Sequence, residues 1–522
     1  MTRAAAEAFA PTVPAAFAES VRRFGSRIAA IGEDGASLTY AELDAQRIAA
    51  ARALLACGVR AGERVAIWAP NSVEWMIAGL AIHSVGAAIV PINTRMKGQE
   101  AGYLLQKSAA RVLLCAGDFL GQHYPGVLGT HRPASLETIV VLGSARPREL
   151  SWPEFLRRGD AVPAAEVERR AAAVLPDACM DVMFTSGTTG LPKGVVTNQG
   201  QNLRVFAEFG ARLGLVPEDR YLVVNPFFHV FGYKAGWLVG LLKGCTVLPH
   251  AVFDAAAVMR RISLQRISVL PGPPTLFISL LDDPQRAGHD LSSLRATITG
   301  AAAVAPSLVE RIRADLGFKV VLTGYGLTES CGVVSLCDAS DDAQTIVTTC
   351  GKPIPGTEVR IDAAPGTAGE ILVRGHNVMQ GYLDDEAATR EAVDAGGWLH
   401  TGDVGLLDAH GYLRITDRLK DMYIAGGFNC YPAEIERMMA AHPAVGQVAV
   451  IGVPDERLGE VGKACVVPKP GQRIEPAELI AWCRGQMANY KVPRYVEVMN
   501  ALPLNAAGKV MKFQLRNPAE IT

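Results

Sequence analysis

The sequence predicts an α/β protein built from more than one domain, and three observations support this prediction. The chain has 522 residues, which is too long for a single hydrophobic core. Short apolar runs alternate with amphipathic stretches along most of its length, the pattern of parallel-type sheets flanked by helices. After about Gly351 the pattern changes to short alternating strands punctuated by glycine, which is typical of a small β-rich subdomain.

The first part of the chain contains the apolar runs that predict the strands of two parallel-type sheets. Most of these runs end in turn residues such as Gly and Pro, as strands of α/β domains do. They cover residues 64–70, 87–92, 111–117, 138–143, 221–228, 245–250, 268–274, 296–302 and 319–326. Amphipathic stretches at residues 40–58 and 305–317 predict helices that pack against the sheets.

The most apolar segment of the chain, residues 76–92, raises the question of a membrane span. It is too short to cross a bilayer, and His83 and Pro91 interrupt it. We therefore expect a buried helix followed by a buried strand.

The last part of the chain predicts a separate small domain. Its pattern is helix, strand, strand, helix, strand, at residues 431–445, 446–454, 462–470, 475–487 and 494–499. About 100 residues suffice for a compact domain. The strands expected at residues 351–361, 369–375 and 411–418 belong to the preceding β-rich subdomain. We place the boundary at the stretch "DRLK", which predicts an N-terminal domain of residues 1–419 and a C-terminal α+β domain of residues 420–522.

Composition and charge exclude several classes of protein. Hydrophobic residues make up 49% of the chain and charged residues 20%, which is a globular balance. The formal net charge is −1, so the chain has no basic footprint for nucleic acid. Ten cysteines occur singly without a CxxC pair, and the N-terminus lacks the apolar core of a signal peptide. We expect a soluble, cytoplasmic protein with reduced thiols and no membrane span.

The stretch "DVMFTSGTTGLPKGVV", residues 181–196, is the strongest candidate for a binding site. An apolar strand runs into a loop rich in Gly, Ser and Thr, whose backbone N–H groups and hydroxyls form a concavity suited to phosphate oxygens. Gly187, Gly190 and Gly194 let the backbone approach an anion closely. Lys193 adds a positive charge on a flexible side chain. This loop predicts phosphate binding.

The two common nucleotide-binding motifs do not fit the chain. The spacing of a Walker P-loop is absent, because Gly508 and Lys509 are followed by Val510 where Ser or Thr is required. The stretch "GYGLTE", residues 324–329, begins like a dinucleotide fingerprint but ends in Glu329 in place of Gly. The phosphate of a nucleotide must therefore be bound by another scheme.

"FTSGTTGLPKGV" resembles the phosphate-loop signature of the acyl-adenylate-forming superfamily, which includes acyl-CoA synthetases, adenylation domains of peptide synthetases, and luciferases. Further motifs follow in the order of that family: "GYGLTE", "GWLHTGDVG", "ITDRLKDMYIAGGFNCYPAEIE" and "NAAGKV". The resemblance covers nearly the whole chain, from Ser37 to Lys512. It implies the fold of this superfamily, with a mobile C-terminal domain. It also implies an AMP-forming carboxylic acid–CoA ligase that uses ATP, Mg²⁺ and coenzyme A.

The resemblance also implies the residues that bind ATP and its metal ion. The loop residues and Lys193 would hold the outer phosphates, Tyr325 would stack on adenine, and Asp403 would accept the ribose hydroxyls. The full set is Thr185, Ser186, Gly187, Thr188, Thr189, Gly190, Lys193, Gly300, Ala301, Ala302, Gly324, Tyr325, Gly326, Asp403 and Arg418. Thr328 would contact the α-phosphate, and Glu329 would be the ligand of Mg²⁺, a cation that prefers oxygen.

Catalysis requires a carboxylate to approach the α-phosphate, and both groups are anions. In the family pattern Lys509 enters the site and bridges them, which lowers the electrostatic barrier. The resemblance assigns the hinge of domain rotation to Lys420. Gly426 and Gly427 would line the channel for the pantetheine arm of CoA, and Lys491 would help to position the CoA end.

The stretch "NPFFHVFGYKAG", residues 225–236, occupies the position of the acyl pocket in this family. His229 would lie at the pocket mouth, and the expected walls are Phe231, Gly232, Tyr233 and Thr323. The lining is mostly apolar, which favours a hydrophobic acid. This stretch, "VLPGPPTLF" and "KDMYIAGGFNCYPAEIE" are also similar to the actinobacterial ligases that activate an indanedione propionate from steroid rings. That acid and medium- or long-chain fatty acids are both candidates.

Other functions remain open at this point. The same adenylation would serve an enzyme that loads a carrier-protein phosphopantetheine, or a luciferase-type oxygenase. A non-catalytic acyl or nucleotide sensor should have lost Lys509, Glu329 or the Gly/Thr loop, and all three are present. The expected partners are a small carboxylic acid and CoA, and a homodimer is left open.

Overall fold

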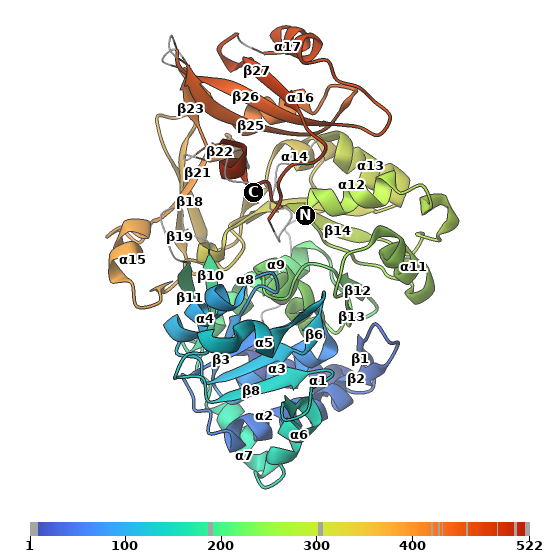
Figure 1. Cartoon of the computed structure of the whole chain (residues 1–522), viewed down its shortest axis with the longest axis vertical. Coiled ribbons are helices and arrows are strands. Elements are labelled where there is room, and N and C mark those ends of the chain that lie inside the picture. The colour runs from blue at the N-terminus through green and yellow to red at the C-terminus, as the bar shows by residue number, and fades with distance from the viewer. Residues whose placement is uncertain are drawn as a thin grey trace.

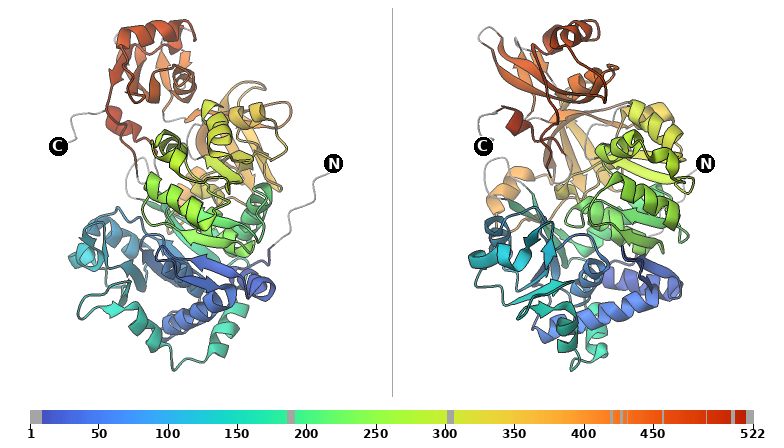
Figure 2. Two further views of the ribbon diagram at one scale, coloured as in Figure 1. Left: turned by 90° about the vertical axis from the view of Figure 1, so that its right-hand side faces the viewer. Right: turned by 45° about the vertical axis from the view of Figure 1, so that its right-hand side comes forward.

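The computed structural model describes residues 9–185, 192–300, 306–418, 421–425, 428–430, 432–455, 458–487, 489–505 and 509–516. The C-terminal domain stands at one end of the long axis, at the top of Figure 1. It remains a separate lobe in both views of Figure 2. The N-terminal sheets and helices fill the rest of the molecule, which agrees with the predicted α/β class.

The largest sheet has the strand order β20-β11-β10-β4-β3-β5-β8-β9. The strands from β10 to β9 pair in parallel, and β11 and β20 extend the sheet beyond β10 by antiparallel pairing. The strands are β3 (Arg64–Trp68), β4 (Ala88–Pro91), β5 (Val112–Ala116), β8 (Thr138–Leu142), β9 (Leu150–Ser151), β10 (Cys179–Thr185), β11 (Lys193–Asn198) and β20 (Gly381–Tyr382). A small hairpin, β6 (Asp118–Phe119) and β7 (Gln122–His123), projects from it.

The second layer consists of two linked sheets with the orders β12-β13-β1-β2 and β14-β15-β16-β17. Their strands are β1 (Ile28–Ile31), β2 (Ser37–Thr39), β12 (Arg220–Val223), β13 (Thr246–Pro249), β14 (Ala296–Gly300), β15 (Val320–Tyr325), β16 (Ser335–Leu336) and β17 (Lys352–Pro353). Residues 268–274 were expected to form a strand, and this was wrong. Only Val269 and Gly272 make isolated bridges there, because Pro271, Pro273 and Pro274 have no N–H to donate.

Helices cover these sheets and begin where the sequence provides caps. The capping box of α2 is an example, because Thr39 Oγ1 accepts the Glu42 N–H and the Glu42 carboxylate accepts the Thr39 N–H. The helices of this domain are α1 (Val13–Phe24), α2 (Tyr40–Ala56), α3 (Val73–Ser84), α4 (Gly98–Lys107), α5 (Tyr124–Leu128), α6 (Trp152–Arg158), α7 (Ala164–Ala172), α8 (Gln199–Arg212), α9 (Val230–Gly232), α10 (Val239–Leu242), α11 (Ala255–Gln265), α12 (Pro274–Asp282), α13 (Pro306–Leu316) and α14 (Ala343–Thr348). A π-helix, Tyr233–Leu238, joins α9 to α10.

The β-rich subdomain and the C-terminal domain follow the predicted order. The subdomain sheet has the order β18-β19-β21-β22, with strands β18 (Thr357–Asp362), β19 (Gly369–Gly375), β21 (Leu399–Leu407) and β22 (Leu413–Arg418), and helix α15 (Glu386–Ala392) beside it. The C-terminal domain contains β23 (Tyr423–Ala425), β24 (Phe428–Cys430), α16 (Pro432–Met439), β25 (Val445–Asp455), β26 (Gly459–Pro468), α17 (Pro476–Arg484), β27 (Tyr495–Val498) and α18 (Lys512–Arg516). The αββαβ prediction is thereby confirmed.

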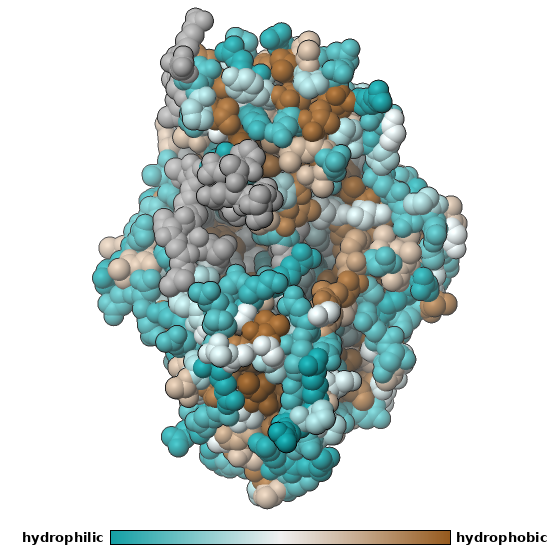
Figure 3. Space-filling view, viewed as in Figure 1, coloured by the Kyte–Doolittle hydropathy of each residue, from teal (hydrophilic) through white to brown (hydrophobic). Residues whose placement is uncertain are grey.

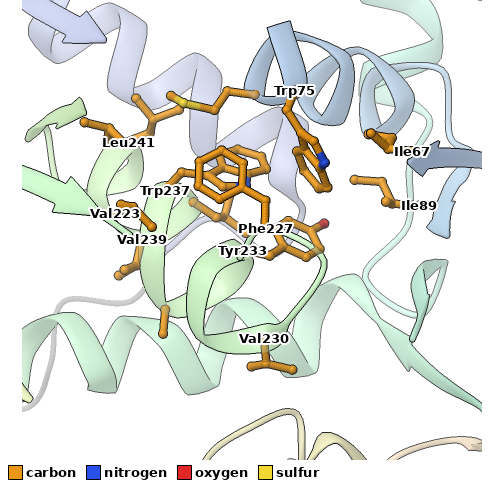
Figure 4. Packing of buried hydrophobic residues seen from close by; sticks show 14 of the residues in the cluster. Ile67, Trp75, Ile89, Val223, Phe227, Val230, Tyr233, Trp237, Val239 and Leu241 are labelled. Atoms are coloured by element: carbon orange, nitrogen blue, oxygen red, sulfur yellow. The ribbon is translucent and has the colours of Figure 1, made fainter. Parts of the chain in front are cut away.

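An aromatic cluster occupies the core where α3 meets the π-helix. The rings of Trp75, Phe227, Tyr233 and Trp237 point toward one another (Figure 4). Trp75 lies 5.5 to 5.7 Å from each of the other three ring centroids, and Tyr233 stacks on Trp237 at 5.3 Å. Aromatic pairs of this kind contribute about 0.5–1.5 kcal/mol each beyond their buried area. The cluster fixes the segment that was expected to form the acyl pocket.

Residues 76–92 form the second half of α3 and strand β4, as expected, and nearly all of them are buried. Within the described ranges, no helix is long and apolar enough to cross a membrane. Hydrophilic residues cover much of the face in Figure 3, while apolar residues are more frequent on the C-terminal domain.

Candidate active site

Strands β10 and β11 form a hairpin that presents the ends of the predicted phosphate loop. Thr185, the last residue of β10, lies directly opposite Lys193, the first residue of β11. The expected binding residues Ser186, Gly187, Thr188, Thr189 and Gly190 lie outside the described residues, so their roles stay predictions. The hairpin itself is held from its other side, because Val195 pairs with Tyr382 of β20.

Glu329 lies next to this hairpin. It belongs to a short 3₁₀ helix, Thr328–Ser330, which follows β15. Thr185 Oγ1 donates a hydrogen bond to Glu329 Oε1 at 3.3 Å, and the Tyr382 hydroxyl donates to the same oxygen at 3.0 Å. The Lys193 ammonium lies 5.1 Å from the centroid of the Tyr382 ring. Sequence reasoning predicted three of these four residues and missed Tyr382.

These oxygen donors fit a hard cation. Mg²⁺ commonly binds through one or two carboxylates together with substrate phosphates. Glu329 and Thr185 supply a carboxylate and a hydroxyl beside the expected phosphate loop. In the part of the chain that the structure describes, no cluster of three or more His, Cys, Asp or Glu residues could form an all-protein metal site. The donor set therefore suits a metal ion that arrives with a nucleotide.

The turn after β15 brings Glu329 into place through close backbone packing. A Cβ atom at Gly326 would lie 2.1 Å from the Gly332 carbonyl oxygen, which only glycine avoids. Tyr325 just before it is largely buried, and its hydroxyl donates to Asp403 Oδ2 at 2.7 Å. The structure thus brings together two residues expected to contact adenine and ribose.

The other expected nucleotide residues are placed in part. Gly300 and Gly324 pair across the parallel strands β14 and β15. Arg418 lies opposite Asp403 across β21 and β22, and only its backbone is described. Ala301 and Ala302 lie outside the described residues, so their contact with a base stays a prediction.

His229 caps the short helix α9. Its Nδ1 accepts the Phe231 N–H at 3.2 Å, which leaves the ring proton of the neutral imidazole on Nε2. Burial lowers the pKa of His229 to about 4, although the residue retains some exposed surface. The imidazole is therefore uncharged at neutral pH, which suits a pocket for an apolar group.

The remaining residues expected in the pocket wall have different surroundings. Phe231 is partly exposed, whereas Tyr233 is fully buried, and its hydroxyl lies 2.6 Å from His83 Nε2. A Cβ at Gly232 would approach the carbonyl oxygens of Asn225 and Pro226 to 2.2 Å, so the chain is tightly folded there. The Thr323 hydroxyl lies 2.9 and 3.0 Å from the carbonyl oxygens of Ile346 and Thr349.

Asn71 holds the pocket segment in place, and sequence reasoning did not identify it. Its buried amide nitrogen lies 2.9 to 3.2 Å from the carbonyl oxygens of Val223, Asn225 and His250. Its oxygen accepts the Phe227 N–H at 2.8 Å. One side chain thereby links two backbone segments, residues 223–227 and the chain at His250, which directly follows β13. The dipeptide Pro70–Asn71 after β3 was the only available signal, and it marks a turn without naming its partners.

A buried ion pair connects the pocket segment to the phosphate hairpin. Lys234, on the π-helix, lies 2.9 Å from Asp181 of β10, and both side chains are fully buried. Thr197 of β11 donates to the same carboxylate at 2.8 Å and accepts from Lys234 at 3.1 Å. π-helical turns are rare and occur frequently at functional sites. This network fixes the spacing between the two halves of the candidate site.

In the C-terminal domain, Lys509 lies in a tight loop. Its N–H donates to the Asn505 side chain at 2.9 Å, and its carbonyl accepts the Asn505 N–H at 2.8 Å. Leu504 and Val510 form the bridge that closes this loop. The Lys491 ammonium lies 5.6 Å from the ring centroid of Tyr490. The hinge and channel residues Lys420, Gly426 and Gly427 lie outside the described residues.

A hollow of about 310 Å³ also lies in this domain, among residues such as Met499, Leu502 and Leu515. None of its lining residues belongs to the cluster around Glu329, which consists of Thr185, Lys193, Glu329 and Tyr382. The candidate active site is therefore identified by its chemistry and not by the size of a cavity.

Comparison with known proteins identifies the family of the chain. The AMP-binding enzyme family matches residues 17–383, and its C-terminal domain matches residues 434–509. Two similar curated proteins are named as 7a-methyl-1,5-dioxo-octahydro-1H-inden-4-yl propanoyl:CoA ligases. The one from Rhodococcus jostii (strain RHA1) is 49% identical and the one from Mycobacterium tuberculosis (strain ATCC 25618 / H37Rv) 50% identical, each over 97% of this chain and 98% of the relative.

A similar solved structure is that of the anthranilate CoA ligase AuaEII with anthranoyl-AMP. It superposes with a TM-score of 0.88 at 28% identity over 97% of both chains. The fold and the site thus define an acyl-adenylate-forming enzyme. The chain belongs to the AMP-binding enzyme family and is an AMP-forming carboxylic acid–CoA ligase, with ATP and CoA as its co-substrates.

Proposed function

We propose that this ligase activates a hydrophobic fused-ring propanoic acid of the kind derived from steroid rings. The observation that carries the proposal is the 49–50% identity to two indene-propanoyl ligases along the full length of the chain. The mostly apolar segment of residues 225–236 and the neutral His229 within it support a substrate without charge apart from its carboxylate. A medium- or long-chain fatty acid is the alternative substrate.

The reaction proceeds in two steps. A carboxylate oxygen of the acid attacks the α-phosphorus of ATP, the bond to the β-phosphate breaks, and pyrophosphate leaves. The CoA sulfur then attacks the acyl carbonyl, loses its proton, and displaces AMP. Each step needs aligned reactants and positive charge or dipoles around the reacting groups.

We assign the first step to the cluster around Glu329. Lys193 and the loop after Thr185 would hold the outer phosphates, and Thr328 the α-phosphate. Glu329 with Thr185 would hold Mg²⁺, which when bound neutralises phosphate charge. Tyr325 and Asp403, joined by their 2.7 Å hydrogen bond, would receive the adenosine.

We assign the contact between carboxylate and α-phosphate to Lys509, and the thiol step to a rotated C-terminal domain with its hinge at Lys420. The short loop that holds Lys509 supports a defined position for this residue. A cytoplasmic location is supported by the ten cysteines, which form no disulfide within the described ranges. A homodimer is a further proposal, which light scattering of the purified protein would check.

The experiment is acid-dependent release of pyrophosphate from ATP and Mg²⁺, with and without CoA. The panel holds a fused-ring propanoic acid, aryl acids, and short, medium and long fatty acids. We expect the highest kcat/KM for the fused-ring acid, and faster turnover with CoA. A fatty acid that outranks it by tenfold would overturn the substrate proposal. Release that ignores CoA would indicate a carrier protein as the acceptor.

A further inference from the structure

Tyr382 lies between the two charged side chains of the nucleotide site. It comes from β20, a two-residue strand that follows the β-rich subdomain sheet strand β19 in the chain but pairs with β11 of the large sheet. The backbone around it is fixed on both sides, because the Leu383 N–H donates to the Gly194 carbonyl and the Met379 N–H to the Glu329 carbonyl. The ring therefore has a set position relative to Lys193 and Glu329.

The hydroxyl and the ring of Tyr382 each contact one of these charged side chains. The hydroxyl donates to Glu329 Oε1 at 3.0 Å, and the Lys193 ammonium lies 5.1 Å from the ring centroid. A hydrogen bond to a carboxylate restricts the rotation of that carboxylate, and a ring face attracts a cation. One neutral side chain thus orients an acid and a base that would otherwise be free to pair with each other or turn to solvent.

We propose that Tyr382 is a positioning residue of the nucleotide site. Its hydroxyl orients the Glu329 carboxylate toward the metal ion, and its ring holds Lys193 toward the outer phosphates of ATP. The inference rests on the roles assigned to Glu329 and Lys193 in the proposed function. Tyr382 acts through Lys193 and Glu329. Its substitution should therefore alter the binding of ATP and Mg²⁺ and leave the binding of the acid unchanged.

The chain contains a matched control outside this site. The Tyr412 hydroxyl donates to Asp341 at 2.6 Å, and the Lys352 ammonium lies 4.4 Å from its ring centroid. Tyr412 therefore makes the same two contacts with an acid and a lysine. A purely structural role of such a tyrosine should appear equally in both variants.

The test uses the full-length protein and isothermal titration with ATP, in Mg²⁺ and in EDTA. Tyr382→Phe keeps the ring and removes the hydroxyl, so we expect the gain in ATP affinity from Mg²⁺ to fall about tenfold, with affinity in EDTA unchanged. Tyr382→Leu also removes the ring, and ATP affinity in EDTA should then fall as well. The KM for the acid should stay within twofold of the parent in both variants. Tyr412→Phe should match the parent in every titration.

Glu329→Gln separates the inference from the function on which it rests. If Glu329→Gln loses the Mg²⁺ gain while Tyr382→Phe retains it within twofold, the inference is overturned and the assignment of Glu329 stands. If Glu329→Gln also retains the gain, both fall. If Tyr382→Phe and Tyr412→Phe weaken binding equally, the tyrosine acts only through stability, and the inference is again overturned.

Discussion

The Tyr325 hydroxyl donates a hydrogen bond to Asp403 Oδ2 at 2.7 Å, which joins β15 of the large domain to β21 of the β-rich subdomain. The sequence suggested separate tasks for these residues, one for adenine and one for ribose. Their contact predicts that the two tasks are coupled. A carboxylate that already accepts the phenol is restrained before any nucleotide arrives, so less conformational freedom is lost on binding.

This contact predicts the effect of Tyr325→Phe. The ring remains for stacking, but Asp403 loses a donor in a mostly buried place. A hydrogen bond to a charged group is worth about 1.5–3 kcal/mol, so we expect the KM for ATP to rise at least tenfold with kcat less affected. Steady-state kinetics with varied ATP measure this. An unchanged KM for ATP would show that the hydrogen bond does not organise the site.

Asn71→Leu should affect the acid and spare ATP. The substitution keeps the approximate volume and removes the amide that holds the carbonyls of Val223, Asn225 and His250. We expect the KM for the acid to rise about tenfold, as loss of one or two buried hydrogen bonds implies, while the KM for ATP stays within twofold. Asn377→Leu is the control, because that buried amide donates to the Val333 carbonyl and not to a carbonyl of the pocket segment. Equal changes in both constants would contradict a local role.

The Lys234–Asp181 pair predicts a strong coupling in stability. Removing one partner leaves a charge in a site with no exposed surface. Lys234→Met should therefore lower the free energy of unfolding by about 3–5 kcal/mol. Lys234→Met with Asp181→Leu should cost less than Lys234→Met alone, because no unpaired charge remains. Urea denaturation measures both.

The exposed pair Arg266–Asp290 serves as the control for the Lys234 and Asp181 variants, since both of its side chains are more than half exposed. Arg266→Met should change stability by less than about 1 kcal/mol. A double variant as unstable as the sum of its two single variants would show that Lys234 and Asp181 contribute independently.

His83 predicts a loss of stability in acid. Burial, assisted by the charge of Lys234, lowers the pKa of His83 from 6.5 to about 3. Between these values the unfolded chain binds a proton that the folded chain does not, so stability is complete above pH 6.5 and falls as the pH decreases toward 3. One such group gives a slope of about 1.4 kcal/mol per pH unit. Denaturation of His83→Gln between pH 7 and 5 should show a slope smaller by up to this amount. His410→Gln, at an exposed site, is the control.

Lys509→Ala should separate the two half-reactions. The lysine is proposed to bring the carboxylate to the α-phosphate, a contact needed only for adenylation. Formation of the acyl-adenylate should fall by at least 100-fold, while thioester formation from added acyl-adenylate and CoA should stay within a few fold. Rapid-quench measurement of each half-reaction decides this. An equal loss in both would place Lys509 elsewhere in the mechanism.

Much of the fold could be predicted from the sequence because hydrophobic periodicity reports local structure. The apolar runs of β3, β4, β5 and β8 and the amphipathic stretch of α2 were all found where expected. The prediction of a strand at residues 268–274 was wrong because it followed the apolar residues and gave too little weight to the three prolines. The π-helix at Tyr233–Leu238 leaves no distinct pattern, since its apolar residues fit a buried α-helix equally well.

The residues of the candidate site were also predicted only in part from the sequence. Motifs identified Thr185, Lys193 and Glu329. Thr185 is hydrogen-bonded to Glu329 and pairs with Lys193 across the hairpin. Tyr382 and Asn71 were missed because their partners are more than 50 residues away along the chain. Pairing between distant segments depends on how strands and turns meet in three dimensions, and no local pattern encodes it.

Glu436 links the chain next to Lys509 to the rest of the small domain. Its carboxylate accepts the Val450 N–H of β25 at 2.7 Å and lies 2.8 Å from Lys512 Nζ, the first residue of α18. The segment that follows Lys509 is therefore tied to β25 of the small domain. If that domain turns, the lysine must travel with it over the full arc. The protein then needs no separate mechanism to withdraw the ammonium group before CoA approaches.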